Sequence, residues 1–372
     1  MATHPGDSKP SSNRYFSLDI IKAIAIILVV IWHTKPIVFL NIETNTSFLV
    51  KALNKISLLF YFEISLLAVP SFFIVSLYIF FLKSSNNNQL PYLKKRLIRI
   101  SQVFFVWSIV QFSIFFLTTG VLVNGEISQF HWLPFESPLQ LLKMGGPSLP
   151  KVGDSVFYFL FNLMLLVTIC STFSILRNKF SKHINYFIFS LLPISLIGFE
   201  ISSFLGYNVP YHSILNFIVY IPITYFLSFL EPQKIKKEYA TIKYLGIMGT
   251  LFLLLIYKNE VWGYTSIYAR SSLVIGSVLL FLVALKIADL RFCIKYKSFW
   301  LFFSTHSLGI FAIHKYWQYV ILSITENYRY REQFVFFNLQ IQNLLFFLLI
   351  IFLTSFTCFF LGRSKFLMKY VK

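Results

Sequence analysis

The stretch LDIIKAIAIILVVIWH, residues 18–33, decides the fold, because it is apolar apart from Asp19, Lys22 and His33. About 20 apolar residues cross a bilayer as a helix, and this stretch lies within such a run. Nine further runs follow it, which predicts an all-α polytopic membrane protein, a helix bundle of about ten transmembrane helices. The predicted spans cover residues 17–40, 56–82, 100–123, 155–176, 184–205, 210–230, 241–257, 265–288, 299–323 and 339–362.

The composition excludes an ordinary soluble protein. Apolar residues make up 57% of the 372 residues and charged residues only 13%, against about a quarter charged in a soluble domain. Cys170, Cys293 and Cys358 lie in or beside apolar runs without a paired spacing, so we expect neither a disulfide framework nor a metal site. We expect residues 1–13 to form a disordered N-terminal tail and residues 14–372 to form one transmembrane domain.

The basic residues predict the orientation of the chain. In a soluble protein a net charge of +19 would suggest nucleic acid. Here the charges fall in short loops between apolar runs, so we expect no nucleic-acid partner. With the N-terminus inside, 22 basic residues lie on the inner side and 8 on the outer side. Because cytoplasmic loops carry the excess of Lys and Arg, both termini are predicted to be cytoplasmic, with a long outer loop over about residues 124–154.

Three ionisable side chains form a polar stripe in the first predicted span. Lys22 and His33 are eleven residues apart, which places them about 20° apart around a helix and roughly 16 Å apart along it. Asp19 lies one turn before Lys22, close enough to pair with it. Ionisable residues inside a span are costly and mark functional sites. Alternatively, Asp19 and Lys22 extend to the inner interface and His33 to the outer one, which leaves their alignment unexplained.

Other polar residues lie within later spans. The ninth predicted span carries His306, His314 and Lys315. A histidine in a helix bundle either serves a site or is satisfied by a backbone carbonyl. Glu63 and Arg270, in the second and eighth predicted spans, are candidates for a buried pair.

The segment between the second and third predicted spans is strongly basic. Arg96 and Arg99 are one helical turn apart there, so their side chains lie side by side, where they can grip a phosphate-bearing ligand. The alternative is that both residues serve only the positive-inside rule.

Four of these segments resemble, in sequence order, the motifs of the acyltransferase-3 family of membrane O-acyltransferases. That family places Arg or Lys before His with ten residues between them, after a Leu-Asp pair, as in residues 18–33. The segment AVPSFFIVS (residues 68–76) is similar to its second helix, although Leu77 replaces the usual Gly. Arg96-x-x-Arg99 resembles its Arg-x-x-Arg motif, and SLGIFAIH (residues 307–314) resembles its late Ser-x-x-Ile-Tyr-x-x-His helix. The resemblance covers nearly the whole chain.

The resemblance implies transfer of an acyl group, usually acetyl, from acyl-CoA to a hydroxyl of a cell-envelope glycan or lipid-linked saccharide. CoA is a polyanion made in the cytoplasm, so basic residues at the inner face suit this donor. The predicted site comprises His33 and Asp19 as catalytic residues, Lys22, Arg96 and Arg99 as acyl-CoA contacts, and His314, Ser76 and Glu63 as cavity-lining residues.

Such an enzyme needs no bound cofactor or metal, with acyl-CoA, typically acetyl-CoA, as co-substrate. His33 then acts either as a general base on the acceptor hydroxyl or as a carrier that accepts the acyl group itself. We expect a multi-pass protein of a bacterial inner (cytoplasmic) membrane, in contact with membrane lipids. The pattern carries no signal for an oligomeric state.

Two other functions share part of this pattern. A transporter or flippase of a lipid-linked glycan would have the same spans and midplane charges, but it would need no CoA. A different membrane acyltransferase fold would place its catalytic histidine in another span and give Lys22 no special role. CoA binding that depends on Lys22 or Arg99 distinguishes a transporter from an acyltransferase.

Overall fold

The secondary structure of the described residues is entirely helical, which confirms the all-α fold class. The structure, a computed structural model, describes residues 15–36, 48–84, 89–119, 157–177, 181–263, 266–329 and 336–371. Within these ranges six helices are long and apolar enough to cross a membrane, or seven if one bent pair counts as a span. The predicted tail (residues 1–13) and outer loop (residues 124–154) lie outside the described residues.

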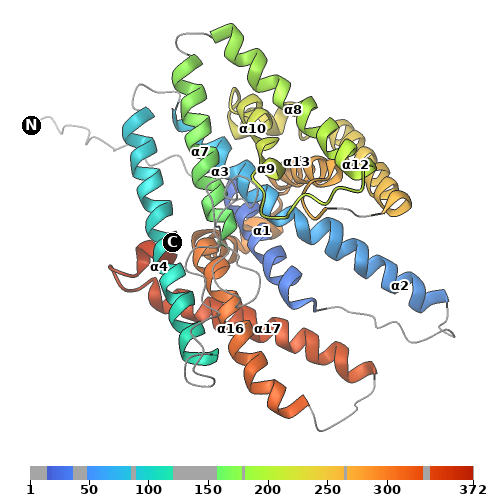
Figure 1. Cartoon of the computed structure of the whole chain (residues 1–372), viewed down its shortest axis with the longest axis vertical. Helices are drawn as coiled ribbons and strands as arrows, with labels where there is room; N and C mark the ends of the chain where they lie inside the picture. The colour runs from blue at the N-terminus through green and yellow to red at the C-terminus, as the bar shows by residue number, and fades with distance from the viewer. Residues whose placement is uncertain are drawn as a thin grey trace, which may run out of the picture.

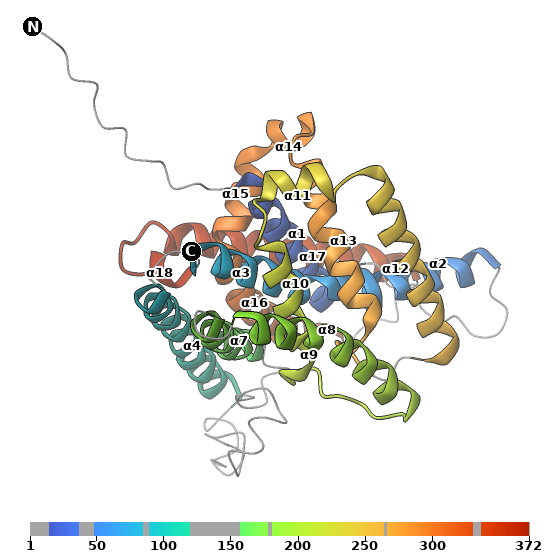
Figure 2. The same ribbon diagram turned by 90° about the horizontal axis from the view of Figure 1, so that it is seen from above.

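Helix α1 (Phe16–Thr34) is the central helix of the bundle, and Figure 2 shows it surrounded by other helices. Ile20, Ile21 and Ile26 project in different directions from α1, and none has any exposed surface. A helix that is apolar all round is stable when it is buried on every side. Polar residues on α1 are therefore held inside the protein. The neighbours of α1 include α3 (Ala68–Ser84), α13 (Ser271–Ile287), α15 (Lys297–Thr305), α16 (Ser307–Arg329) and α17 (Phe336–Leu361).

Helix α1 ends at Thr34, before the predicted end of the first span at residue 40. Lys35 adopts a left-handed conformation with φ of 44°, and its N–H donates to the Ile31 carbonyl. Pro36 follows and cannot continue a helix, because it lacks an N–H donor. His33 consequently lies in the last turn of α1.

The second predicted span, residues 56–82, is interrupted. Helix α2 (Phe48–Leu59) passes through a π-helical turn (Phe60–Ile64) and a 3-10 turn (Ser65–Leu67) before α3 begins. Single π turns within helices occur frequently at functional sites. This one places the fully buried Glu63 inside the protein, and the turn after it lies beside His33.

Two other predicted spans are broken. The sixth, residues 210–230, contains the short helices α9 (Leu215–Ile218) and α10 (Tyr220–Leu227), and the chain then bends by 89° into α11 (Pro232–Glu238). The ninth is interrupted at His306, between α15 and α16. The remaining helices are α4 (Gln89–Thr119), α7 (Tyr158–Arg177), α8 (Ser181–Phe204), α12 (Ile242–Trp262), α14 (Arg291–Lys295) and α18 (Met368–Val371).

The outer helices expose apolar side chains, as expected of a protein in lipid. Figure 1 shows α8, α12 and α17 at the periphery of the bundle. Only 11%, 6% and 17% of their most apolar segments are buried in the protein. Since each predicted run contains helix, the chain is a polytopic integral membrane protein. The number of spans and the side of each terminus stay predictions.

The close packing of α18 against α16 predicts a large effect of adding a side chain at Gly309. A Cβ atom there would lie 2.9 Å from the Val371 backbone and 3.0 Å from the Cys358 sulfur. We expect Gly309→Val to destabilise the protein by about 1–3 kcal/mol, the usual effect of overpacking. Thermal unfolding in detergent would show a midpoint lower by several degrees. Gly249→Val, in α12 with nothing within 4 Å, is the matched control, and an equal effect there would contradict the packing argument.

Candidate active site

A small cavity surrounds the end of α1 at His33, and we call it the histidine pocket. Its volume is about 90 Å³. It lies between α1, the 3-10 turn and the start of α3, α7, α16 and the segment before α13. The residues that line it are Val29, Trp32, His33, Ser65, Leu66, Ala68, Val69, Tyr158, Tyr211, Ile267, Tyr268 and Phe311.

A larger cavity of about 540 Å³ lies nearer the start of α1, and we call it the basic cavity. No acidic side chain is among the described residues that line it. Its walls come from α1, α3, α4, α7, α15 and α16. Five cationic side chains line it: Lys22, Lys83, Lys95, Arg96 and Arg99.

The two cavities are neighbours along α1. Lys22 lines the basic cavity and His33 lines the histidine pocket, while Phe311 of α16 belongs to both walls. The Phe311 ring packs against Phe159 and Phe72, with centroids 5.3 and 6.5 Å away. This aromatic group separates a space that attracts anions from a space that contains a histidine.

Arg96 is held in place by its neighbours in the basic cavity. Its Nη2 donates to the main-chain carbonyl of Ser76 at 2.8 Å, and its Nη1 donates to the Tyr92 hydroxyl at 3.1 Å. The guanidinium also lies 5.9 Å from the centre of the Phe80 ring. Arg99, one turn later, lines the same cavity, so the predicted side-by-side arrangement of the two arginines is present.

Asp19 is buried between α1 and α15. Its Oδ1 accepts a hydrogen bond of 2.5 Å from the Ser304 hydroxyl, and only 4% of Asp19 is exposed. Ser304 lines the basic cavity, whereas Asp19 is not among the lining residues of either cavity. Asp19 therefore fixes part of the cavity wall, and its catalytic role stays a prediction.

The histidines of the ninth predicted span occupy different places. His314, which the sequence predicted to line the cavity, is not among the lining residues of either cavity, but its ring lies 5.1 Å from that of His33, centroid to centroid. His306 lies at the break between α15 and α16, with its ring 4.5 Å from Phe302 and outside the lining of both cavities. The Nδ1 atoms of His306 and His314 each lie 3.0 Å from the backbone carbonyl oxygen of the residue four positions earlier. A carbonyl satisfies one nitrogen of each ring, as the alternative interpretation expected.

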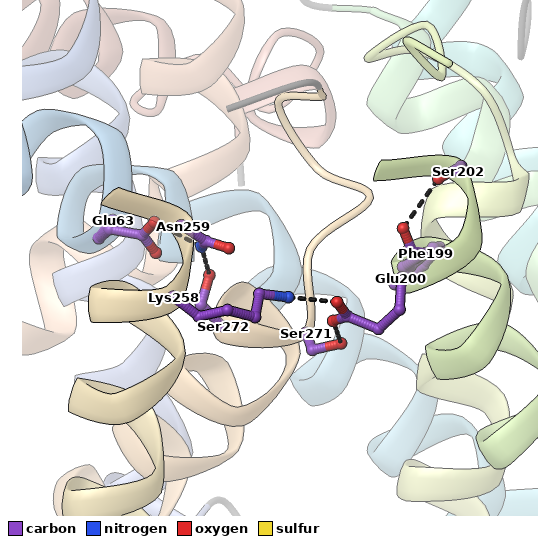
Figure 3. Close-up of polar contacts among 8 residues, drawn as sticks. All are labelled: Glu63, Phe199, Glu200, Ser202, Lys258, Asn259, Ser271 and Ser272. Atoms are coloured by element: carbon purple, nitrogen blue, oxygen red, sulfur yellow. Dashed lines mark hydrogen bonds and ion pairs between the residues drawn. The ribbon is translucent and has the colours of Figure 1, made fainter. Parts of the chain in front are cut away.

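Glu63 and Arg270 form the buried pair that the sequence indicated. Arg270 Nη1 lies 3.4 Å from Glu63 Oε1 and donates to the Phe62 carbonyl at 3.0 Å. Figure 3 shows Asn259 of α12 beside Glu63, where its Nδ2 donates to Glu63 at 3.0 Å and to Ser272 at 2.9 Å. Glu63 is not among the lining residues of either cavity. It instead joins the π turn to α12 and α13.

A second polar group lies near the first and is more exposed. Glu200 of α8 accepts from Ser271 at 2.7 Å and forms an ion pair with Lys258 of α12 (Figure 3). The Lys258 and Glu200 side chains are 25% and 38% exposed, against 6% and 0% for Arg270 and Glu63. The two ion pairs provide a comparison between a partly exposed and a buried pair.

We expect Arg270→Met to destabilise the protein strongly. Removing one partner of a buried ion pair leaves an uncompensated charge, which costs about 3–5 kcal/mol. Lys258→Met should have a much smaller effect, because partly exposed ion pairs contribute about 1 kcal/mol or less. Thermal unfolding in detergent measures both, and the double variant Glu63→Gln with Arg270→Met should recover part of the loss. Equal effects of the two single variants would show that burial does not set the energy of the pair.

Sequence reasoning assigned Lys83 and Lys95 only to the orientation of the chain, yet both line the basic cavity. The sequence did contain a signal for their place in the cavity. Lys83 is seven residues, or two helical turns, after Ser76 and so lies on the same helix face. Lys95 is similarly one turn before Arg99. The tyrosines of the histidine pocket carried no such signal, because they come from three separate segments.

Comparison with protein-family models identifies the family to which the chain belongs. The model of the acyltransferase-3 family, described as an acyltransferase domain, matches residues 15–363. No curated protein and no solved structure matches the chain significantly. The matched range contains both cavities and every predicted site residue. The chain therefore belongs to the acyltransferase-3 family and is an integral membrane acyltransferase.

Proposed function

We propose that this acyltransferase moves an acetyl group from acetyl-CoA on the cytoplasmic side to a hydroxyl of a cell-envelope glycan or lipid-linked saccharide. Its membrane would be the inner (cytoplasmic) membrane of a bacterium. One observation carries the proposal: the basic cavity and the histidine pocket lie along one helix and share Phe311. The first suits a polyanionic donor and the second suits its reacting thioester.

The charge of the basic cavity supports a CoA donor. CoA carries a diphosphate and a 3′-phosphate, and clustered Lys and Arg side chains bind phosphates through charge-assisted hydrogen bonds. Arg96 is already oriented by Ser76 and Tyr92, so less side-chain entropy is lost when it binds a ligand. Lys22 precedes His33 by roughly 16 Å along α1, a distance that suits the long pantetheine arm of CoA.

The size and lining of the histidine pocket support a short acyl group. A volume of about 90 Å³ accommodates an acetyl group and is too small to enclose a long acyl chain. Tyr158, Tyr211 and Tyr268 line the pocket, and their hydroxyl groups are able to donate to or accept from an acyl carbonyl or an acceptor hydroxyl.

Two routes from thioester to ester are available at His33. As a general base, His33 takes the proton of the acceptor hydroxyl while the hydroxyl oxygen attacks the thioester carbonyl. The C–S bond then breaks, and the CoA thiolate leaves and takes the proton from the imidazolium. As a carrier, a nitrogen of His33 attacks the carbonyl first, the C–S bond breaks, and the CoA thiolate leaves and takes the ring proton, which gives a neutral acyl-imidazole. The acceptor hydroxyl oxygen then attacks the acyl carbon, the C–N bond breaks, and the hydroxyl proton passes to the ring of His33.

The wild-type protein in nanodiscs tests the proposal directly. We expect saturable binding of acetyl-CoA and slow release of the CoA thiol, with water as the acceptor. Lipid-linked saccharide or glycan fractions from bacterial envelopes should accelerate thiol release and acquire the labelled acetyl group. Absence of binding at millimolar acetyl-CoA would contradict acetyl-CoA as the donor of the acyl group.

A further inference from the structure

His314 is a fully buried histidine that the reaction at His33 does not by itself require. It lies on α16, has no exposed surface, and its ring centroid is 5.1 Å from that of His33. Its Nε2 has no hydrogen-bond partner among the described residues. A buried polar atom left without a partner is unfavourable by about 1–3 kcal/mol, so this nitrogen calls for an explanation.

The hydrogen bond at Nδ1 fixes the tautomer of His314. The Ile310 carbonyl, 3.0 Å from Nδ1, is able only to accept, so Nδ1 carries the proton. In the neutral ring Nε2 therefore bears the lone pair. The unpartnered atom is an acceptor inside the protein, next to the residue proposed to exchange protons with substrate.

The geometry makes His33 the natural donor to this atom. Two imidazoles joined by an N–H···N bond of about 2.9 Å have ring centroids about 5 Å apart, and the observed separation is 5.1 Å with planes tilted by 37°. Gln318, one turn after His314 on α16, donates to the main-chain carbonyl of His33 at 2.7 Å. Helix α16 thus holds the backbone of His33 and presents an acceptor to its ring.

We infer that His314 is a positioning residue, whose Nε2 accepts the ring N–H of His33 once the His33 ring turns towards it. This inference rests on the proposed function of His33. The hydrogen bond selects the tautomer in which the other nitrogen of His33 carries its lone pair towards the histidine pocket. That lone pair is required on both routes, for taking the hydroxyl proton and for attacking the thioester carbonyl. When His33 becomes positively charged, the bond to His314 also stabilises the cation.

The test compares side chains that keep or lose the acceptor at the position of Nε2. Gln places its carbonyl oxygen near the position of Nε2, whereas Asn reaches only the position of Nδ1 and Leu has no polar atom. We expect His314→Asn and His314→Leu to lower kcat for CoA thiol release from acetyl-CoA about 10- to 100-fold, by analogy with the loss of partners that orient metal-bound histidines. The KM for acetyl-CoA should not change. His314→Gln should retain most of the wild-type kcat.

His306→Leu is the matched control, because His306 makes the same contact with a carbonyl four residues earlier, but its ring packs against Phe302 at the break between α15 and α16, whereas the His314 ring packs against His33. Full kcat in His314→Asn or His314→Leu would overturn the inference. So would equal loss in His314→Gln and His314→Leu with normal acetyl-CoA binding, since a role in packing alone predicts no rescue. His33→Ala is measured alongside: activity there contradicts the proposed function itself, whereas an inactive His33→Ala with a fully active His314→Leu contradicts only the role of His314.

Discussion

Replacing His33 with alanine should abolish acyl transfer while leaving donor binding intact. His33 is the titratable side chain of α1 that lines the histidine pocket, separated from the basic cavity by Phe311. A general base contributes about 10²- to 10⁴-fold to the rate, and loss of a covalent carrier would reduce the rate further. Release of the CoA thiol from acetyl-CoA in nanodiscs should therefore fall by at least about 10²-fold. The dissociation constant for acetyl-CoA should stay within about threefold of wild type, because that change is under 1 kcal/mol.

The control for this variant is His183→Ala, because His183 is exposed near the start of α8 and far in sequence from the motif. It should match wild type in binding and in thiol release. Full activity of a well-folded His33→Ala protein would show that another residue performs the chemistry. In that case both routes at His33 would be wrong.

Removing single cations from the basic cavity should weaken donor binding. Lys22→Met and Lys95→Met each remove a charged partner for phosphate, and hydrogen bonds to charged groups contribute about 1.5–3 kcal/mol. We expect the dissociation constant for acetyl-CoA to rise about 10- to 100-fold, with a smaller change in kcat at saturating donor. Titration in nanodiscs measures the binding constant. Because the interaction is between opposite charges, wild-type binding should also weaken as salt increases.

Adjacent residues on α4 provide a matched control for this prediction. Lys94 and Lys95 are both exposed, but only Lys95 is among the lining residues of the basic cavity. Lys94→Met removes the same net charge and should leave the binding constant unchanged. Equal weakening by the two variants would indicate a general effect of charge at the membrane surface. If the removed cation contacts the 3′-phosphate, its loss should weaken binding of dephospho-CoA, which has no 3′-phosphate, less than it weakens binding of CoA.

Membership of the acyltransferase-3 family identifies the chain as an acyltransferase rather than a transporter. A transporter shares the helices and the buried charges, and cations at a cavity also suit an anionic lipid-linked glycan, so the cavity alone does not separate the two functions. A different acyltransferase fold would give Lys22 no special role, whereas Lys22 lines the basic cavity on the same helix as His33.

The fold class was predictable because lipid imposes a simple rule on sequence. A spanning helix satisfies its own backbone hydrogen bonds and needs about 20 apolar residues, so apolar runs revealed nearly all the helices. The breaks were not predictable in this way. At the π turn around Glu63, the Phe62 carbonyl accepts from Arg270, which is far along the chain, so this contact cannot be read from local sequence. The break at His306 likewise carries no signal in hydrophobicity.

The alignment of Lys22 with His33 was determined by the sequence alone, because helical geometry relates residues on one helix. The same holds for Arg96 beside Arg99. Contacts between distant segments were decided only by the tertiary structure, since helix periodicity says nothing about which faces meet. Packing of α16 against α1 brought His314 to 5.1 Å from His33 and placed Phe311 between the two cavities. Packing also placed Lys83 and Lys95, which in the sequence predict only the orientation of the chain, in the wall of the basic cavity.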